Sequence, residues 1–346
     1  MSRSERRKHS SHKAAKAVRS DQGSDPKLKY HIHRKFPDPL RLPVKGSAKH
    51  SKSHSALHDE QLAMPFVVQK RAEPQPFLKW AGGKASLLRQ LEEFFPHEID
   101  RYIEPFLGGG AAFFHLKHRF PDMRPFLRDS NKELINCYRV VRDRPEELME
   151  FLDEHAQRFR TNGDNYYYAV RKQYDLTDDL ARAARTIFLN KTCYNGLYRV
   201  NKKGEFNVPI GSYINPEIVQ RDNIMLCSTA LQKAKIEYHE FDTINPQADD
   251  FVYFDPPYHP TGNGSFTKYT KMDFSEKDQA RLRDFAIKLH RQGVKVMLSN
   301  SDMPFIRDLY SSAIWNIVVV QAPRMVNCKP DGRGAVNELI ITNYTL

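Results

Sequence analysis

Four consecutive residues, Asp255-Pro256-Pro257-Tyr258, combine groups that can hold a planar amine. They follow the apolar run 251–254, whose β-branched and aromatic residues predict a buried strand. A carboxylate and a proline carbonyl can accept the two amine hydrogens, because proline has no N–H to compete for these acceptors. The tyrosine ring can stack on the plane of the amine. The alternative is a strand followed by a proline turn and a half-buried tyrosine. All four residues are candidate catalytic residues.

A glycine-rich turn, Glu104-Pro105-Phe106-Leu107-Gly108-Gly109-Gly110, lies between a predicted strand and a predicted helix. Glycine lets the backbone approach a ligand closely and adopt positive φ. The next predicted strand ends at Asp129, 21 residues after Gly108, a distance that suits an acid bound to a ribose hydroxyl pair. This order predicts a nucleoside site, although glycines that only pack a turn against a helix would give the same pattern.

Two further segments carry groups that can serve a ligand. In Lys79-Trp80-Ala81-Gly82-Gly83-Lys84, the glycines can turn the chain and aim Lys84 at an anionic or carboxylate group near a helix N-terminus. A turn with two solvated lysines is the alternative. Phe241-Asp242 is predicted to end a strand, where it can contact an adenine ring and its amine. Here the alternative is an acid that caps a helix.

The segment Tyr194-Asn195-Gly196-Leu197-Tyr198-Arg199 combines stacking groups, an amide and a guanidinium. Arginine reads guanine and asparagine reads adenine in DNA grooves. An aromatic or apolar wedge can fill the space that a flipped base leaves in the duplex. Asn-Gly is also an ordinary hairpin-turn signal, and in that case Arg199 would simply be exposed.

An α/β scaffold is needed to bring these segments together, since ligands bind beyond the carboxyl ends of strands in open α/β sheets. The apolar patterns predict strands at about 102–107, 124–128, 236–241, 251–254, 294–299, 314–320 and 337–344, the last two at the sheet edge. They predict helices at about 87–95, 111–116, 131–141, 145–158, 165–190, 222–234 and 275–291. Residues 191–215 read as a loop plus a hairpin. The Gly262/Gly264 loop is a candidate lid.

Positive charge is concentrated at the start of the chain. The net charge of the 346 residues is +12, and residues 1–60 hold 15 Lys and Arg against 6 Asp and Glu. Residues 1–74 lack a sustained apolar period and are predicted to be a disordered basic tail. Such a tail can be a nonspecific nucleic-acid arm or a solvated extension.

Several classes of protein do not fit the sequence. It has no apolar segment after the first basic cluster that would make a signal peptide, and no apolar run long enough to span a membrane. The four cysteines (Cys137, Cys193, Cys227 and Cys328) show no zinc spacing and are expected to be buried free thiols. We therefore expect a cytoplasmic protein, associated with the nucleoid if the host is bacterial, with no metal.

These motifs, in this order, resemble the DNA N6-adenine methyltransferases of the Dam type, the D12 class with the α-group order of motifs. The resemblance runs from about Phe77 to Ile341. It rests on the segments above and on Asn190-Lys191-Thr192-Cys193, Phe206-Asn207-Val208-Pro209, Phe266-Thr267-Lys268-Tyr269 and Ser299-Asn300. It implies a Rossmann-like, doubly wound methyltransferase sheet formed by residues 75–143 and 235–346, with a mostly helical target-recognition region inserted at 144–234.

The resemblance also implies roles for individual residues. It implies S-adenosylmethionine as methyl donor, bound by Trp80, Lys84, Glu104, Pro105, Phe106, Gly108, Gly110, Asp129, Phe241 and Asp242. It implies double-stranded DNA as partner, commonly read at GATC, with Lys79, Tyr194, Asn195, Leu197, Arg199 and Pro209 as DNA-binding positions. Tyr258 would stack on a flipped adenine, while Asp255 and the Pro256 carbonyl accept from its N6. We expect a monomer in solution.

Three departures from the family pattern concern sequence choice rather than chemistry. The chain has Ser212 where a basic residue often stands and Ser301 where histidine often stands, and the stretch 326–333 differs. One rival function is methylation of cytosine N4 or of RNA adenine, and the recognition segment argues against it. Another is a DNA-binding module without activity, and the complete set of cofactor and catalytic positions argues against that. A role in replication, gene regulation or restriction–modification stays open.

Overall fold

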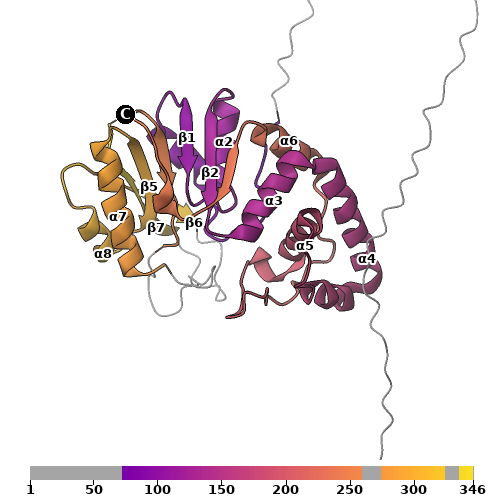
Figure 1. Cartoon of the computed structure of the whole chain (residues 1–346). Coiled ribbons are helices and arrows are strands. Elements are labelled where there is room, and N and C mark those ends of the chain that lie inside the picture. The colour runs from indigo at the N-terminus through magenta and orange to yellow at the C-terminus, as the bar shows by residue number, and fades with distance from the viewer. Residues whose placement is uncertain (1–71, 259–273, 324–334, 346) are drawn as a thin grey trace, which may run out of the picture. The chain divides into compact units, whose positions relative to one another are not determined.

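A seven-stranded sheet forms the centre of the computed structural model, which describes residues 72–258, 274–323 and 335–345. The strands are β1 (Arg101–Glu104), β2 (Arg124–Asp129), β3 (Lys235–Tyr238), β4 (Phe251–Phe254), β5 (Lys295–Ser301), β6 (Asn316–Pro323) and β7 (Ala335–Thr342). They lie in the order β3-β2-β1-β4-β5-β7-β6 (Figure 1). All pairs are parallel except those of β7, which runs antiparallel to both β5 and β6. The predicted doubly wound α/β sheet is confirmed.

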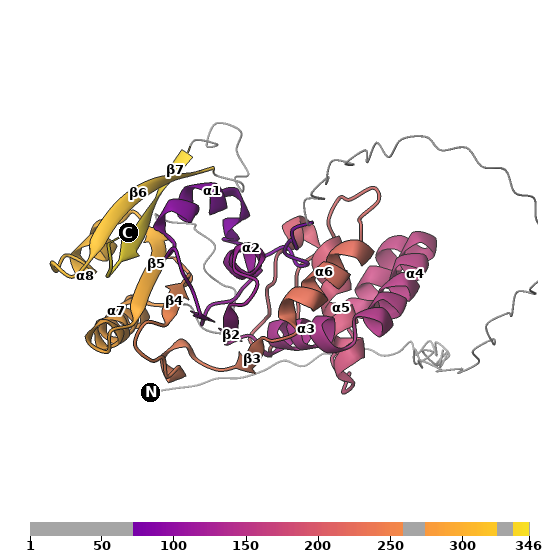
Figure 2. The ribbon, with the colours of Figure 1, turned by 90° about the horizontal axis from the view of Figure 1, so that it is seen from above.

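Helices cover both faces of the sheet, so its central strands are apolar on both sides. The α-helices are α1 (Leu88–Leu91), α2 (Ala111–Arg119), α3 (Lys132–Asp143), α4 (Pro145–Arg171), α5 (Asp179–Thr192), α6 (Arg221–Leu231), α7 (Glu276–Arg291) and α8 (Pro304–Leu309). In β4, Phe251 and Tyr253 pack into the core that contains α2, whereas Val252 and Phe254 pack into the core that contains α7. Figure 2 shows α2 and α7 on opposite sides of the sheet.

Three details differ from the sequence prediction. The last strand, β7, lies inside the sheet between β5 and β6, so β6 alone forms that edge. The predicted helix 165–190 is wrong: α4 continues to Arg171 through a kink at Gly163, and α5 begins only after Asp178, whose side chain accepts from the Ala181 N–H as an N-cap. The short helix α8 was not predicted.

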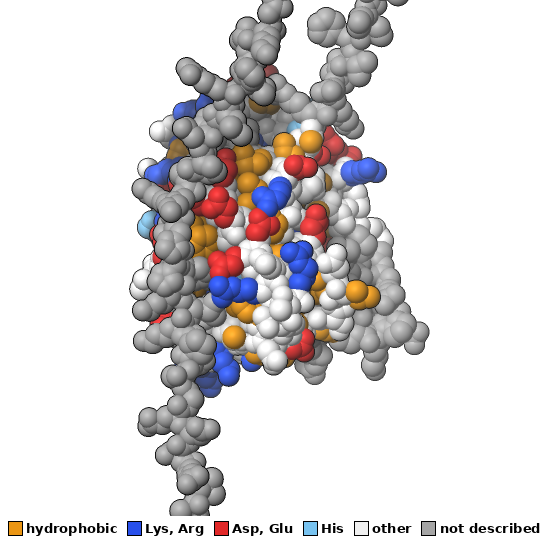
Figure 3. Space-filling view, turned by 90° about the vertical axis from the view of Figure 1, so that its right-hand side faces the viewer, with side chains coloured by type: hydrophobic (Ala, Val, Ile, Leu, Met, Phe, Trp, Pro, Cys, Tyr) orange, Lys and Arg blue, Asp and Glu red, His pale blue; other side chains and the backbone are white. Residues whose placement is uncertain are grey.

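Helices α3 to α6 gather beside β3, the other edge strand. Their apolar side chains belong to the same core as those of α2, so no separate core marks the predicted inserted region. The boundaries at 143/144 and 234/235 therefore stay a prediction. Figure 3, which shows the structure from the α4 side, displays basic and acidic side chains interspersed over this face.

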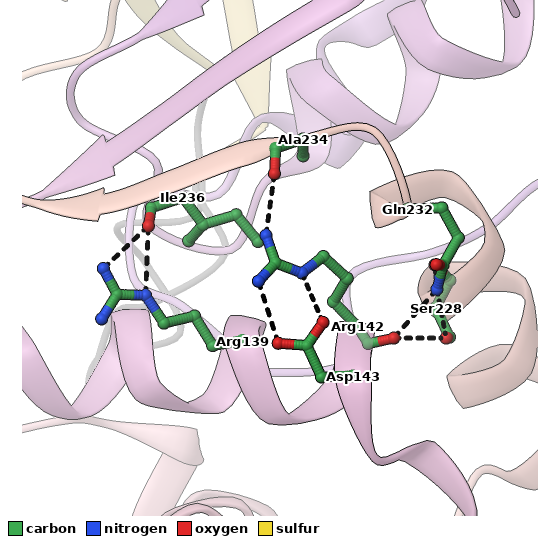
Figure 4. Close-up of polar contacts among 7 residues, drawn as sticks. All are labelled: Arg139, Arg142, Asp143, Ser228, Gln232, Ala234 and Ile236. Carbon is green, nitrogen blue, oxygen red and sulfur yellow. Dashed lines mark hydrogen bonds and ion pairs between the residues drawn. The ribbon is translucent and has the colours of Figure 1, made fainter.

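Two arginines of α3 attach this helical group to the end of the sheet (Figure 4). Arg139 donates two hydrogen bonds to the carbonyl of Ile236 in β3, and Arg142 donates one to the carbonyl of Ala234. Ser228 of α6 in turn donates to the carbonyl of Arg142. These bonds satisfy backbone acceptors at the end of a helix and beside an edge strand, where no regular partner exists.

Some features named from the sequence lie outside the described residues. They are the basic tail up to residue 71, the Gly262/Gly264 loop, Phe266-Thr267-Lys268-Tyr269, the stretch 326–333 and Cys328. The other three cysteines, Cys137, Cys193 and Cys227, are buried free thiols, as expected. Among the described helices, none is both long enough and apolar enough to cross a membrane.

Candidate active site

The order of the strands places the tetrapeptide beside the glycine-rich turn. Strands β1 and β4 are parallel neighbours, with Ile103 paired to Val252, and the chain order of the sheet reverses between them. Their carboxyl ends lead directly into Glu104–Gly110 and Asp255–Tyr258. A reversal of this kind opens a crevice at the carboxyl ends of the strands, which is where ligands bind in doubly wound folds.

Asp255 forms an ion pair with Lys84 in this crevice. The Lys84 Nζ lies 2.7 Å from the Asp255 Oδ1 and donates to the carbonyl of Gly82 at 2.8 Å. Lys84 is only 4% exposed, so its charge is sequestered from water and needs this partner. The predicted aim of Lys84 at a carboxylate is thus observed, and the carboxylate is that of the tetrapeptide.

The surroundings of Asp255 bring the pKa of this carboxyl group close to neutrality. Burial raises the pKa, the Lys84 ammonium lowers it and the Glu338 carboxylate raises it, to a value of about 6. Asp255 is therefore mainly ionised at neutral pH and can accept hydrogen bonds from an amine. Its side chain is 19% exposed, so an entering group can reach it.

Tyr258 is held from both its ring and its hydroxyl. The Lys84 ammonium lies over the ring, 4.6 Å from its centroid, and the hydroxyl donates to the Glu338 Oε2 at 2.7 Å. Burial, with Asp255 and Glu338 nearby, raises the Tyr258 pKa well above its usual value. The hydroxyl therefore stays a neutral donor. The ring is fixed near Asp255 as a flat surface.

Asp129 holds the glycine-rich turn through a hydrogen bond to its backbone. Its two carboxylate oxygens accept the N–H groups of Gly108 at 3.0 Å and Asn131 at 2.8 Å, and the Tyr138 hydroxyl donates to the Gly108 carbonyl at 3.0 Å. Gly108 has φ +48°, and a Cβ atom there would lie 2.8 Å from the Trp80 ring. Only glycine therefore lets the indole pack against this turn.

Glu104 and Asp129 bring two further acidic groups to the carboxyl ends of β1 and β2. Glu104 is 3% exposed and accepts from the Tyr102 hydroxyl at 2.9 Å, and burial raises its pKa well above the usual range. Burial also raises the pKa of Asp129 to about 6, although the Gly108 and Asn131 N–H groups oppose this shift. Of these three carboxyl groups, only those of Asp129 and Asp255 are partly exposed, and they suit a ligand that carries hydroxyl, ammonium or sulfonium groups. No group of acidic, His or Cys side chains within the described residues is arranged to hold a metal ion.

Phe241 and Asp242 lie in a short 3₁₀ turn, Phe241–Thr243, and not at the end of a strand as predicted, because β3 stops at Tyr238. The Phe241 ring stacks on Phe106, with centroids 5.3 Å apart and planes 25° apart. The Arg281 guanidinium covers Phe241 at 4.7 Å and lies 3.6 Å from the Asp242 carboxylate. Phe241 is buried, so Phe106 presents the more exposed ring of this pair.

The expected recognition segment forms the predicted hairpin. Isolated bridges pair Cys193 with Ile210 and Val200 with Phe206. Tyr194, Asn195, Pro209 and Lys79 are exposed, and Leu197 and Arg199 are half-buried. The Tyr194 N–H donates to the Pro209 carbonyl at 2.9 Å. Arg199 donates from Nε to the Asn207 Oδ1 at 2.8 Å, which fixes the direction of its side chain.

A single amide links this hairpin to the segment that contains Trp80. The Asn190 side chain accepts from the Lys79 N–H and donates to the carbonyls of Lys79 and Gly196, each at 2.8 or 2.9 Å. Trp80 also stacks on Tyr198 of the hairpin, with centroids 5.4 Å apart. The candidate cofactor residues and the candidate DNA-binding residues therefore form one connected structure.

Comparison with known proteins identifies the family. The sequence model of the D12 class N6 adenine-specific DNA methyltransferases matches residues 80–326, which are most of the chain. The chain belongs to this family. A type II methyltransferase of Methanocaldococcus jannaschii, M.MjaIII, is 46% identical over 290 residues, which cover 79% of this chain and 100% of that protein. The DNA adenine methylase of Vibrio cholerae is 35% identical over 270 residues, which cover 76% of this chain and 94% of that one.

A third relative is the type II methyltransferase M1.LlaDCHI of Lactococcus lactis subsp. cremoris. It is 41% identical over 291 residues, which cover 81% of this chain and 99% of that protein. The predicted Dam-type resemblance is confirmed, and the chain is an adenine-specific DNA methyltransferase.

Three residues around the tetrapeptide of this D12-class enzyme were given no role from the sequence. Glu338, Gln279 and Asn300 contact the tetrapeptide or each other from β7, α7 and β5. Asn300 was noted only as part of a family motif. For Gln279, an amide on an otherwise apolar helical face is the signal that could have drawn attention to it.

Proposed function

We propose that this D12-class enzyme transfers a methyl group from S-adenosylmethionine to N6 of an adenine flipped out of duplex DNA, within GATC. The observation that carries the proposal is the Asp255 carboxylate at the end of β4, paired with Lys84 and adjacent to the Tyr258 ring. A base must leave the stack to reach such a group. The neighbouring strand ends and glycine-rich turn carry acidic and aromatic side chains, Asp129 and Phe106 among them, that fit a nucleoside with a charged sulfur.

Asp255 and the Pro256 carbonyl prepare the amine. The N6 lone pair is delocalised into the purine ring, so the free amine is a weak nucleophile. When both N6 hydrogens are accepted, the nitrogen becomes more tetrahedral and its lone pair is directed out of the plane. The Asp255 Oδ1 is buried and lies 2.7 Å from the Lys84 ammonium. We therefore assign the acceptor of the N6 hydrogen to Oδ2. The acceptors also stabilise the positive charge that grows on N6.

The transfer is a direct in-line displacement. Bound S-adenosylmethionine would supply the methyl group from its sulfonium, whose sulfur would keep the electrons of the broken S–C bond as the N6–C bond forms. Tyr258 would stack on the flipped adenine and keep N6 in line, and alignment of this kind supplies much of the rate. The surplus N6 proton leaves through Asp255 after the transfer. Trp80, Lys84, Asp129 and the Glu104–Gly110 turn would hold the donor.

The test combines labelled S-adenosylmethionine with each of three duplexes. The first contains GATC, the second contains a variant of GATC altered at one base pair, and the third has a scrambled sequence. We expect label in N6-methyladenine only with GATC. Label in N4-methylcytosine or in every duplex would contradict the proposal. A GATC duplex with 2-aminopurine at the target position tests base flipping separately, because its fluorescence rises when the base leaves the stack. If the fluorescence does not rise although the enzyme is active, base flipping is excluded and the rest of the proposal stands.

Arg199 is assigned to base recognition rather than to general affinity. Arg199→Ala should reduce the preference for GATC over a duplex altered at one base pair about tenfold or more, since one bidentate arginine contact supplies about 1–3 kcal/mol of discrimination. The ratio of kcat/KM values on the two duplexes measures this. Lys203→Ala is the matched control, because Lys203 is an exposed cation in the same hairpin. Unchanged discrimination in Arg199→Ala would exclude the assigned role.

A further inference from the structure

A chain of buried amides runs from the sheet to the tetrapeptide. The Asn300 Nδ2, at the end of β5, donates to the Gln279 Oε1 on α7 at 2.9 Å. The Gln279 Nε2 then donates to the carbonyl of Pro257 at 3.0 Å. The Asn300 Oδ1 accepts from the Ser301 N–H at 2.9 Å, which fixes which way the amide faces. Gln279 and Asn300 are both 0% exposed.

The direction of each bond in this chain is determined. Each amide has a distinct donor end and acceptor end, and the backbone N–H of Ser301 can only donate. The Asn300 Oδ1 must therefore face Ser301, its Nδ2 must face Gln279, and the Gln279 Nε2 must face Pro257. Buried amides without partners cost stability, so the arrangement has one satisfied form.

The position of the Pro257 carbonyl decides the geometry of its neighbours. The proline ring fixes φ of Pro257, and the bond from Gln279 fixes the direction of its carbonyl and hence ψ. Peptide groups are planar, so the Pro256 carbonyl before this residue and the Tyr258 Cα after it are then placed relative to α7. These two neighbours are the second acceptor for N6 and the stacking ring of the proposed function.

We propose that Gln279 and Asn300 are positioning residues for methyl transfer, which hold the Pro256 carbonyl and Tyr258 in the geometry that an exocyclic amine requires. The inference rests on the proposed function of the tetrapeptide. Neither residue would touch the adenine or the methyl donor. Their effect passes through the Pro257 carbonyl, and it should be seen in the chemical step while binding of either substrate is preserved.

The first test replaces Gln279 by methionine, which keeps the volume and removes the donor. The single-turnover rate of methyl transfer, with enzyme in excess over a GATC duplex and saturating S-adenosylmethionine, should fall about 10- to 100-fold, because small misplacements of reacting groups have effects of this size. The dissociation constants for donor and duplex should stay within about twofold. Leu282→Met is the matched control, a buried apolar position of the same helix, and should keep the wild-type rate.

The second test uses Gln279→Glu, which separates positioning from packing. When it is protonated, the introduced carboxyl group can still accept from Asn300 and donate its O–H to the Pro257 carbonyl, whereas the ionised form cannot donate. Burial raises the pKa of such an acid. The rate of this variant relative to wild type should therefore rise as the pH is lowered from about 8 to about 5.5. The melting temperature is followed at each pH to separate local geometry from unfolding.

The outcomes are distinct. A Gln279→Met rate within about twofold of wild type would overturn the inference, and so would a ratio of the Gln279→Glu rate to the wild-type rate that does not change with pH. A loss of rate that only follows the melting temperature would also assign the two amides to packing alone. Absence of N6-methyladenine with the wild-type enzyme would instead refute the proposed function, and so the two failures can be told apart.

Discussion

Asp255 lies between a cation and an anion, and this balance sets its protonation at physiological pH. The Lys84 ammonium and the Glu338 carboxylate act in opposite directions on a carboxyl group whose pKa is already raised by burial. The carboxyl group is thus poised near pH 6 and is not permanently ionised. Alanine would remove every acceptor beside the buried Lys84, whereas asparagine removes the charge but keeps an oxygen to which Lys84 can donate, so asparagine is the better probe.

The rate of methyl transfer should fall as the pH drops through about 6, because the protonated Asp255 loses acceptor capacity. Asp255→Asn should transfer methyl groups about 10²- to 10³-fold more slowly, as when one preorganised electrostatic contact is removed. Its residual rate should show no inflection near pH 6. Single-turnover rates between about pH 5 and 8 measure both effects.

The donor must be saturating in this experiment, because burial raises the pKa of Asp129 to about 6 as well and its titration would affect binding. An inflection near pH 6 that persists in Asp255→Asn would assign the titration to another group. Retained binding of S-adenosylmethionine by Asp255→Asn would show that its crevice is intact.

At the scale of the elements, β7 supplies Glu338, which contacts Tyr258 of the tetrapeptide. It is inserted antiparallel beside β5, with Glu338 opposite Ser301, at the carboxyl end of β5. From there Glu338 accepts the hydroxyl of Tyr258, 80 residues earlier in the chain. The reversed direction of one strand therefore supplies an acidic group at the edge where the parallel strands end.

Tyr258 and Glu338 should behave as a coupled pair. Tyr258→Phe and Glu338→Gln should each slow methyl transfer several-fold, and the double variant should be slowed less than the two effects combined, with a coupling of about 0.5–3 kcal/mol. Tyr258→Ala should be slower than either, since it removes the ring. Glu338→Gln should also move the acid limb of the pH profile to lower pH, because Glu338 raises the pKa of Asp255. Additive effects would separate the two residues.

The sequence was sufficient to predict features whose residues lie close together in the chain. The tetrapeptide after an apolar run and the glycine turn before a helix identify themselves by residue type and spacing. Glu338 and Gln279 could not be found in this way, since their role depends on which strand and helix meet the tetrapeptide. The predicted break between residues 158 and 165 coincides with the kink at Gly163, where the backbone is not helical. The second break, before the N-cap Asp178, was missed.

At the scale of the whole molecule, charge is divided unequally along the chain. Residues 1–70 hold sixteen Lys and Arg against six Asp and Glu, which gives them +10 of the net charge of +12. The rest of the chain is thus almost neutral, in line with the mixed charges seen in Figure 3. We therefore expect long-range attraction to phosphates to depend on the tail more than on the methyltransferase fold.

Deletion of residues 1–70 should weaken duplex binding at low salt and make the dependence of log K on log[salt] shallower, by about 0.9 for each phosphate that the tail no longer neutralises. The truncation lies close to a natural boundary, because Val68–Leu346 forms a compact unit of its own. The single-turnover rate at saturating duplex should be unchanged, which serves as the control for folding. An identical salt slope would deny the tail an electrostatic role.

The position of β7 also constrains how the enzyme is made. During vectorial synthesis β6 emerges before β7, yet every strand partner of β6 in the described sheet lies on β7. Until β7 is available, β6 exposes unpaired backbone, β5 lacks its outer neighbour, and Tyr258 lacks Glu338. The β6–β7 pair is local, with Pro323 opposite Ala335, whereas β7 meets β5 and Tyr258 from much farther along the chain. We therefore expect the contacts of β7 to β5 and to Tyr258 to be the slow ones in the folding of this half of the sheet.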